Sequence, residues 1–197
     1  MLIEHRGRTP VVPASVVIAS TAVISGDVTL GENVRVLHGA VLSAEDGPIT
    51  VGDDVVIMEG ALLRGRARNP VVVGSSVMIG PRAHVNGATI GDEAFIATGA
   101  SVFPGAVIGA GAEVRINGVV QVNTTLEPGA VVPIGWVAVG SPASILSPDR
   151  HEEIWAIQRE LGFTATVYGV GPDATMRDIM REQVQFYGAH RDDRALE

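Results

Sequence analysis

Branched apolar residues recur every six positions through most of the chain, and this period restricts the fold more than any other feature. Fifteen of the eighteen steps between successive anchors are six residues long; the anchors are Val, Ile or Leu at 18, 24, 30, 36, 42, 51, 57, 63, 73, 79, 85, 90, 96, 102, 108, 114, 120, 126 and 132. A period of six fits neither the repeat of an α-helix nor the alternation of a half-buried strand. It is typical of a β-solenoid in which each hexapeptide supplies one strand and one turn, and three hexapeptides close a coil.

The residues between the anchors support the same fold class. A small or β-branched residue stands four positions after nearly every anchor, as at Ala22, Val34 and Ala40. Stacked strands lie about 4.8 Å apart, so the interior of such a prism is narrow and excludes large side chains. The composition agrees, with 4% aromatic residues and 24 glycines. A sandwich of short strands would instead alternate and turn roughly every 8 to 12 residues. We therefore expect an all-β solenoid with helices after it.

The repeat resembles a known superfamily. Over about residues 12 to 146 it is similar to the hexapeptide-repeat, left-handed parallel β-helix superfamily, which includes acyltransferases and γ-class carbonic anhydrases. Only the resemblance implies the left hand, because crossovers between parallel strands are otherwise nearly always right-handed. It also implies a homotrimer of prisms with clefts between subunits.

We expect three segments along the chain: a hexapeptide-repeat domain at 1–146, a helical appendage at 147–190 and a mobile tail at 191–197. Helix signals lie at 147–162 and again at about 173–187. The second helix carries an apolar stripe made of Met176, Ile179, Met180 and Val184. Amphipathic helices of this kind must bury their stripes against another surface. We expect that surface to be the prism or a neighbouring subunit.

Composition excludes several classes of partner and chemistry. The formal net charge is −8, and all 14 basic residues are arginine, so a basic nucleic-acid-binding face is not expected. The lack of cysteine excludes disulfides, thiolate metal sites and cysteine nucleophiles. There is neither a run of 18 apolar residues nor a secretory signal pattern, which predicts no membrane partner and a cytoplasmic location.

Three breaks in the register mark where binding chemistry is expected. Three extra residues separate Leu42 from Val51, four separate Leu63 from Val73, and one is missing before Ile90. Insertions in a solenoid become loops on one edge, which is often the binding edge. Counting anchors in threes predicts a column of outward residues on one face: Ser25, Ser43, Arg64, Asn86, Phe103 and Gln121. A neighbouring edge would carry His38, Glu59, Pro81 and Thr98, and a trimer cleft would combine the two.

The breaks resemble those of γ-carbonic anhydrases, whose zinc lies between subunits. The family's G-H-x4-H-G stretch aligns with residues 80–87, so Pro81 and Asn86 occupy two ligand positions. The first ligand, in a segment resembling IQDG-x3-H, falls on Arg64. The arginine-glycine-aspartate segment of the family reads Ser43-Ala44-Glu45 here. Proline cannot ligate a metal and arginine is a permanent cation, so we expect no metal, no cofactor and no zinc hydratase activity.

Arg64 then becomes the central candidate residue. Paired with Glu45 or Glu59 across a subunit interface, it would hold the trimer together where zinc otherwise would. Alternatively, it binds a small anion, because the guanidinium fork suits carboxylate and phosphate. The candidate ligand-binding residues are Ser43, Arg64, Arg82 and Asn86. The candidate catalytic residues are His38, Glu45, Glu59 and His84.

Three functions stay open on these residues, and the sequence does not decide whether the protein is an enzyme. The first is a trimer without zinc that binds a small anionic metabolite or serves assembly. The second is an acyltransferase that uses acyl-CoA, with His38 or His84 as the general base. The third is a metal-free lyase or hydratase for a carboxylated metabolite, with Glu45 or Glu59 as base and Arg64 as anchor. Stoichiometric zinc or iron would instead mean that the ligand alignment is wrong, or that His38, His84 and a carboxylate build a relocated site.

Overall fold

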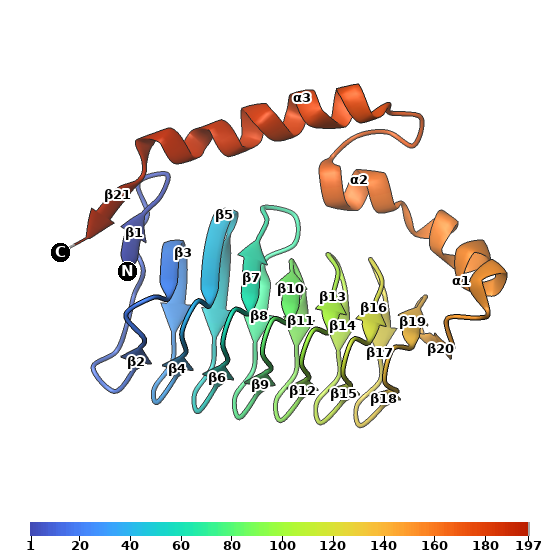
Figure 1. The fold of residues 1–197 in the computed structure, drawn as a ribbon, viewed down its shortest axis with the longest axis horizontal. Helices are drawn as coiled ribbons and strands as arrows, with labels where there is room; N and C mark the ends of the chain where they lie inside the picture. The colour runs from blue at the N-terminus through green and yellow to red at the C-terminus, as the bar shows by residue number, and fades with distance from the viewer. Residues whose placement is uncertain (197) are drawn as a thin grey trace.

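A computed structural model, which describes residues 1–196, is a β-solenoid followed by short helices (Figure 1). This confirms the predicted fold class. One wall is a regular parallel sheet whose strands are all two residues long: β2 (Val17–Ile18), β4 (Arg35–Val36), β6 (Val56–Ile57), β9 (Met78–Ile79), β12 (Phe95–Ile96), β15 (Glu113–Val114) and β18 (Val131–Val132). Each coil adds one strand to this wall, directly above its predecessor.

The other two walls belong to one 14-stranded sheet. The wall that carries the predicted column contains β3 (Val23–Leu30), β5 (Val41–Val51), β7 (Leu62–Gly65), β10 (His84–Asn86), β13 (Ser101–Val102), β16 (Val119–Val120) and β19 (Val137–Val139). The third wall contains β8 (Val71–Val73), β11 (Thr89–Ile90), β14 (Val107–Ile108) and β17 (Thr125–Leu126). The two walls are joined because β5 pairs with both β7 and β8.

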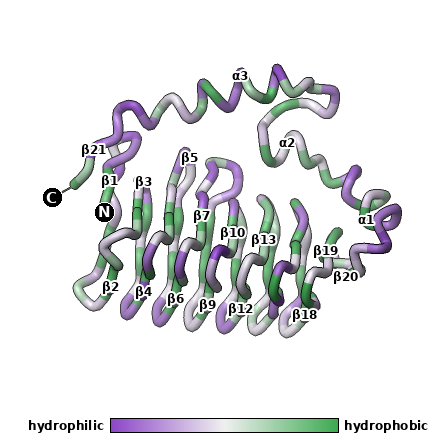
Figure 2. Tube along the Cα trace, viewed as in Figure 1, coloured by the Kyte–Doolittle hydropathy of each residue, from purple (hydrophilic) through white to green (hydrophobic). Residues whose placement is uncertain are grey.

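The core is the stack of anchors predicted by the repeat. Eighteen of the nineteen anchors are at most 2% exposed, and Ile18 in the first coil is partly buried. They stack in register, with Leu42 opposite Leu63 and Leu63 opposite Val85. Figure 2 shows apolar and polar residues alternating along the coils, as this arrangement requires. The six-residue period therefore predicted both the interior and the coil-to-coil register.

The first register break differs from its prediction. The extra residues after Leu42 form no loop, because they extend β5 into one continuous strand of eleven residues. The long neighbouring strand β3 pairs with it in two stretches separated by a bulge. The second break does form a loop, closed by a bridge between Arg66 and Asn69. Both breaks lie at the same edge of the solenoid, where β5 projects in Figure 1.

After β20 (Ser144–Leu146), the chain runs back along the solenoid from the last coil to the first (Figure 1). This return contains α1 (His151–Gln158), the 3-10 turn η1 (Arg159–Leu161), α2 (Phe163–Tyr168), α3 (Met176–Tyr187), the 3-10 turn η2 (Gly188–Asp192) and β21 (Arg194–Leu196). The helix expected at 147–162 is shorter than predicted, and α2 was not predicted. α3 begins at a capping box formed by Thr175 and Asp178.

Residues 191–197 were expected to be a mobile tail, and Glu197 lies outside the described residues. In the described part of this segment, β21 pairs antiparallel with β1 (Leu2–Glu4), which pairs in parallel with β3. Both ends of the described chain therefore join the first coil. No helix in residues 1–196 is long and apolar enough to cross a membrane.

Candidate functional site

The predicted polar column exists on the wall of β3, β5, β7 and β10. Ser25 pairs with Ser43, Ser43 with Arg64, and Arg64 with Asn86. These residues follow the inward anchors by one position, so their side chains point out of the prism. They are nevertheless sheltered, since Ser25, Ser43 and Asn86 are buried and the side chain of Arg64 is 26% exposed.

The column collects buried polar atoms that lack partners within the chain. Within residues 1–196, the buried side-chain atoms without a hydrogen bond are His5 Nε2, Ser25 Oγ, Arg64 Nε, His84 Nε2, Asn86 Oδ1 and Gln121 Oε1. Four of the six belong to the column, and His84 precedes Asn86 by two positions on the same side of β10. Each such atom costs about 1 to 3 kcal/mol if nothing satisfies it. Hydrogen-bonding capacity that the described chain does not use is therefore concentrated on this wall.

The aromatic rings of the returning C-terminal segment cover part of this wall. The guanidinium of Arg64 lies 5.7 Å from the centre of the Tyr187 ring. His84 meets the ring of Phe103 edge-on, and Phe103 contacts Phe163 of α2. Burial, followed by the charge of Arg64, lowers the pKa of His84 below its usual value. His84 is therefore held in its neutral form beside the arginine.

Glu45 is the acidic centre of the site. It is 4% exposed, although carboxylates are rarely buried without partners. Its Oε1 accepts a hydrogen bond from Ser43 Oγ at 2.9 Å and lies 3.8 Å from Arg64 Nε. Its Oε2 lies 3.0 Å from His190 Nε2. The ion pair expected across a subunit interface, between Arg64 and Glu45, thus forms within one chain.

The remaining predicted residues lie at another corner of the prism. His38 and Glu59 are exposed in successive turns, and His38 Nδ1 lies 2.9 Å from Thr21 Oγ1. Arg82 is exposed in the next turn, with a left-handed φ of 55°. In residues 1–196, no hydrogen bond or ion pair connects these three side chains to Glu45, Arg64 or Asn86. The structure therefore divides the predicted residues into two groups.

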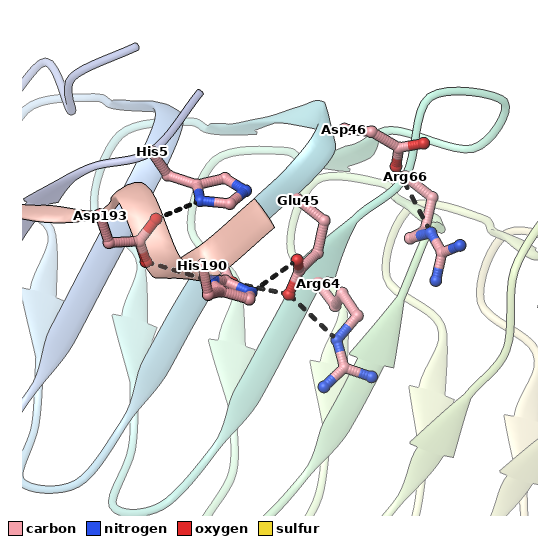
Figure 3. Close-up of polar contacts among 8 residues, drawn as sticks. His5, Glu45, Asp46, Arg64, Arg66, His190 and Asp193 are labelled. Carbon is pink, nitrogen blue, oxygen red and sulfur yellow. Dashed lines mark hydrogen bonds and ion pairs between the residues drawn. The ribbon is translucent and has the colours of Figure 1, made fainter. Parts of the chain in front are cut away.

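Sequence reasoning missed the histidines contributed by the two ends of the chain. His5 follows β1, and His190 lies in η2; their rings stack with centres 4.5 Å apart (Figure 3). Asp193 lies between them, with Oδ1 2.5 Å from His5 Nδ1 and Oδ2 2.8 Å from His190 Nδ1. Burial acts to lower the pKa of His190, but the hydrogen bond that its Nδ1 donates to Asp193 and the charge of Glu45 outweigh it, so the pKa is raised. Neither histidine belongs to the repeat, so no period singled them out.

The donor set at the zinc-ligand positions of the γ-carbonic anhydrase family does not fit a zinc ion. Arg64 and Asn86 are neighbours on β7 and β10, while Pro81 lies in a turn at the other end of β10. A zinc site requires imidazole, thiolate or carboxylate donors, and none of these three residues supplies one. The permanent positive charge of Arg64 also lies at the position where the metal cation would have to bind, and it would repel that cation.

Comparison with known proteins agrees with the fold and the repeat. The chain is 30% identical over 154 residues to "Gamma carbonic anhydrase 1, mitochondrial" and to "Gamma carbonic anhydrase 2, mitochondrial" of Arabidopsis thaliana, and these matches span 75% of this chain. The chain belongs to the hexapeptide-repeat left-handed β-helix superfamily, on its γ-carbonic anhydrase-like branch. It spans about half the length of these relatives, 54% and 53%. No family model matches the sequence.

A solved structure shows the same fold at a lower level of sequence similarity. The hexapeptide transferase family protein of Anaplasma phagocytophilum superposes with a TM-score of 0.54 at 24% identity, covering 95% of this chain and 93% of its own. At this identity the likeness concerns the fold alone. The β-helix of this superfamily therefore includes carbonic anhydrase-like and transferase-like members, and the side chains of the site must decide between them.

Proposed function

We propose that this protein is a cytoplasmic homotrimer of the γ-carbonic anhydrase-like branch that has lost the zinc site and the hydratase activity, and that binds a small anion at Arg64. The observation that carries the proposal is the pair formed by Arg64 and Asn86. They stand side by side at positions where the family has zinc ligands, and each has a buried polar atom that makes no hydrogen bond within the described chain. A permanent cation in a sheltered wall favours an anion where the family binds a cation.

The surroundings of Arg64 restrict the ligand. The side chains of Asn86 and His84 lie on the neighbouring strand and supply polar groups that can complete an anion site. The carboxylate of Glu45, 3.8 Å from Arg64 Nε, repels a second negative charge nearby. Tyr187 covers one side of the guanidinium. These features favour a compact monoanion, such as bicarbonate or a short carboxylate, over a multiply charged phosphate.

The trimer is supported by apolar surface left uncovered in the single chain. On α3, Met176, Met180 and Val184 are 68%, 49% and 68% exposed, while only Ile179 of the stripe is buried. Contiguous apolar surface of this kind marks an interaction site. A neighbouring subunit would cover the stripe and close the cleft over Arg64. The expected solution mass is three times the chain mass of 20.5 kDa, measured by light scattering.

Anion binding is tested by calorimetric titration of chelator-treated protein with bicarbonate, acetate and inorganic phosphate. We expect wild type to bind a monocarboxylate at least about tenfold more tightly than Arg64→Gln, because loss of a charged hydrogen-bond donor costs about 1.5 to 3 kcal/mol. Arg68→Gln is the matched control, since Arg68 is exposed in the neighbouring loop. Equal affinity in wild type and Arg64→Gln would contradict the proposal.

An acyl-CoA-dependent acyltransferase is the second candidate, and His84 favours it. This residue is held neutral by burial and by Arg64, and its Nε2 has no partner in the chain, as a general base requires. His38 is exposed and its Nδ1 lies 2.9 Å from Thr21 Oγ1, at a corner away from Arg64, so it is the less favoured candidate for the general base. Thiol release from acetyl-CoA with small amine acceptors would support this candidate if His84→Asn abolished it and His38→Asn did not.

The third candidate, a metal-free lyase or hydratase, receives less support. Glu59 is exposed in a turn, and no contact within residues 1–196 joins it to Arg64. Glu45 is near Arg64, but its two oxygens face Ser43 and His190. Glu59→Gln should therefore leave anion binding unchanged.

A further inference from the structure

We infer that His5, Glu45 and His190 bind one divalent transition-metal ion of the zinc class, at a site separate from the zinc-ligand positions of the family. The three residues lie directly after β1, in the extended part of β5 and in the 3-10 turn η2, and one ligand atom from each lies within 4.8 Å of the others. Two imidazoles and one carboxylate form a donor set that zinc and related divalent ions prefer. Zinc ligands lie about 2.0 to 2.2 Å from the ion, so small side-chain shifts would bring the three together.

The orientation of the two imidazoles leaves a nitrogen of each ring available to a metal ion. A carboxylate only accepts hydrogen bonds, so both Nδ1 atoms must donate to Asp193. This leaves each Nε2 as the atom available to a ligand. His190 Nε2 faces Glu45, and His5 Nε2 has no partner although the residue is only 1% exposed. A carboxylate that orients metal-binding histidines through Nδ1 is the usual outer-shell arrangement.

Glu45 is held in the same way. Its Oε1 accepts a hydrogen bond from Ser43 and lies near Arg64, and its Oε2 lies 3.0 Å from His190 Nε2, so one oxygen is fixed by the protein and the other faces His190 (Figure 3). Glu45 and Asp193 together carry two negative charges, and Arg64, whose Nε lies 3.8 Å from Glu45 Oε1, offsets part of this charge, so the remaining charge still favours a cation. A stacked pair of histidines next to two carboxylates is thus completed by an ion and needs no further residue.

A surface cavity connects this site to solvent. His5 and Glu45 line it together with Arg6, Arg8 and Asp27. An ion at the site therefore has a route of entry, and a fourth ligand from solvent could approach from this side. The site lies next to the Arg64 site, which shares Glu45, but it depends on no residue at positions 64, 81 or 86.

The test is zinc titration of untagged, chelator-treated protein, followed by calorimetry and by elemental analysis after gel filtration. We expect one zinc per chain in wild type. His190→Gln should weaken binding by at least about 100-fold, and Asp193→Asn by about 10- to 100-fold, because outer-shell changes have effects of that size. His151→Gln, in exposed α1, and Asn86→Ala, at a ligand position of the family, should bind like wild type.

Three outcomes would overturn the inference: no stoichiometric zinc in folded wild type, unchanged affinity in His190→Gln, or loss of binding in Asn86→Ala. Circular dichroism checks that each variant folds, and His190 is suited to this test because its side chain is 35% exposed. The anion titration uses chelator-treated protein and Arg64→Gln. It can therefore succeed or fail independently of the zinc result.

Discussion

Two walls of the solenoid arise from the same hexapeptide but differ in what their outward residues do. One is the regular sheet that begins at β2 and ends at β18, and the other is the polar wall formed by β3, β5, β7 and β10. In the regular sheet every strand is two residues long, and outward side chains such as Val17 and Met78 are exposed. In the other wall β3, β5 and β7 are longer, outward polar residues such as Ser43 and Asn86 are buried, and the C-terminal return contacts Glu45 and Arg64. The repeat builds the scaffold, while departures from it create the enclosed chemistry.

The largest expected effect is on the scaffold. Ile57→Ala removes a side chain that is 0% exposed in the anchor stack, and we expect a loss of about 2 to 5 kcal/mol in the free energy of unfolding. Val17→Ala, at a position 54% exposed on the same wall, should change it by less than about 0.5 kcal/mol. Urea denaturation measures both, and similar losses would contradict the inward and outward assignment.

The next effect tests the extended part of β5. A Cβ atom at Gly47 would lie 2.1 Å from the carbonyl oxygen of Arg66, so Gly47→Ala must push β5 away from the loop after β7. We expect a loss of about 1 to 3 kcal/mol in unfolding free energy. Gly171→Ala is the matched control, because nothing lies within 4 Å of its Cβ position. If Gly47→Ala is as stable as this control, β5 does not pack closely against the loop after β7.

A smaller effect separates stability from binding in the polar wall. Asn86→Leu replaces a buried polar side chain, whose Oδ1 has no partner, by an apolar one of similar size. We expect the unfolding free energy to stay within about 1 kcal/mol of wild type, since an unsatisfied polar group is removed. Anion affinity should fall in the same variant. A stable variant with unchanged affinity would exclude Asn86 from the anion site.

The smallest effect is the pH dependence contributed by His84. Its pKa is lowered in the folded protein by burial and by Arg64, so the unfolded chain takes up the proton first as pH falls. The free energy of unfolding therefore falls as the pH decreases below the pKa that His84 has in the unfolded chain. The loss is complete below the pKa that His84 has in the folded protein. His190, whose pKa is raised, contributes the opposite slope. The unfolding free energies of wild type and His84→Asn are measured from pH 7.5 to 5, and their difference gives the contribution of His84. If the two curves of unfolding free energy against pH are parallel, His84 makes no such contribution.

The fold and the column could be predicted because stacking makes every coil repeat the register of the one before. Leu42, Leu63 and Val85 align by counting alone, and Arg64 and Asn86 follow them. The continuous β5 could not be predicted, because its extension depends on a matching extension of β3. The histidines at positions 5 and 190 meet through the pairing of β1 with β21, a contact between distant segments that leaves no periodic signal.

The proposed metal site lies beside the extended β5, away from positions 64, 81 and 86. Anomalous diffraction at the zinc absorption edge, from crystals soaked in a zinc salt, is the sharpest test of this placement. We expect one strong peak among His5, Glu45 and His190. A peak between subunits beside Asn86 and Pro81 would contradict it.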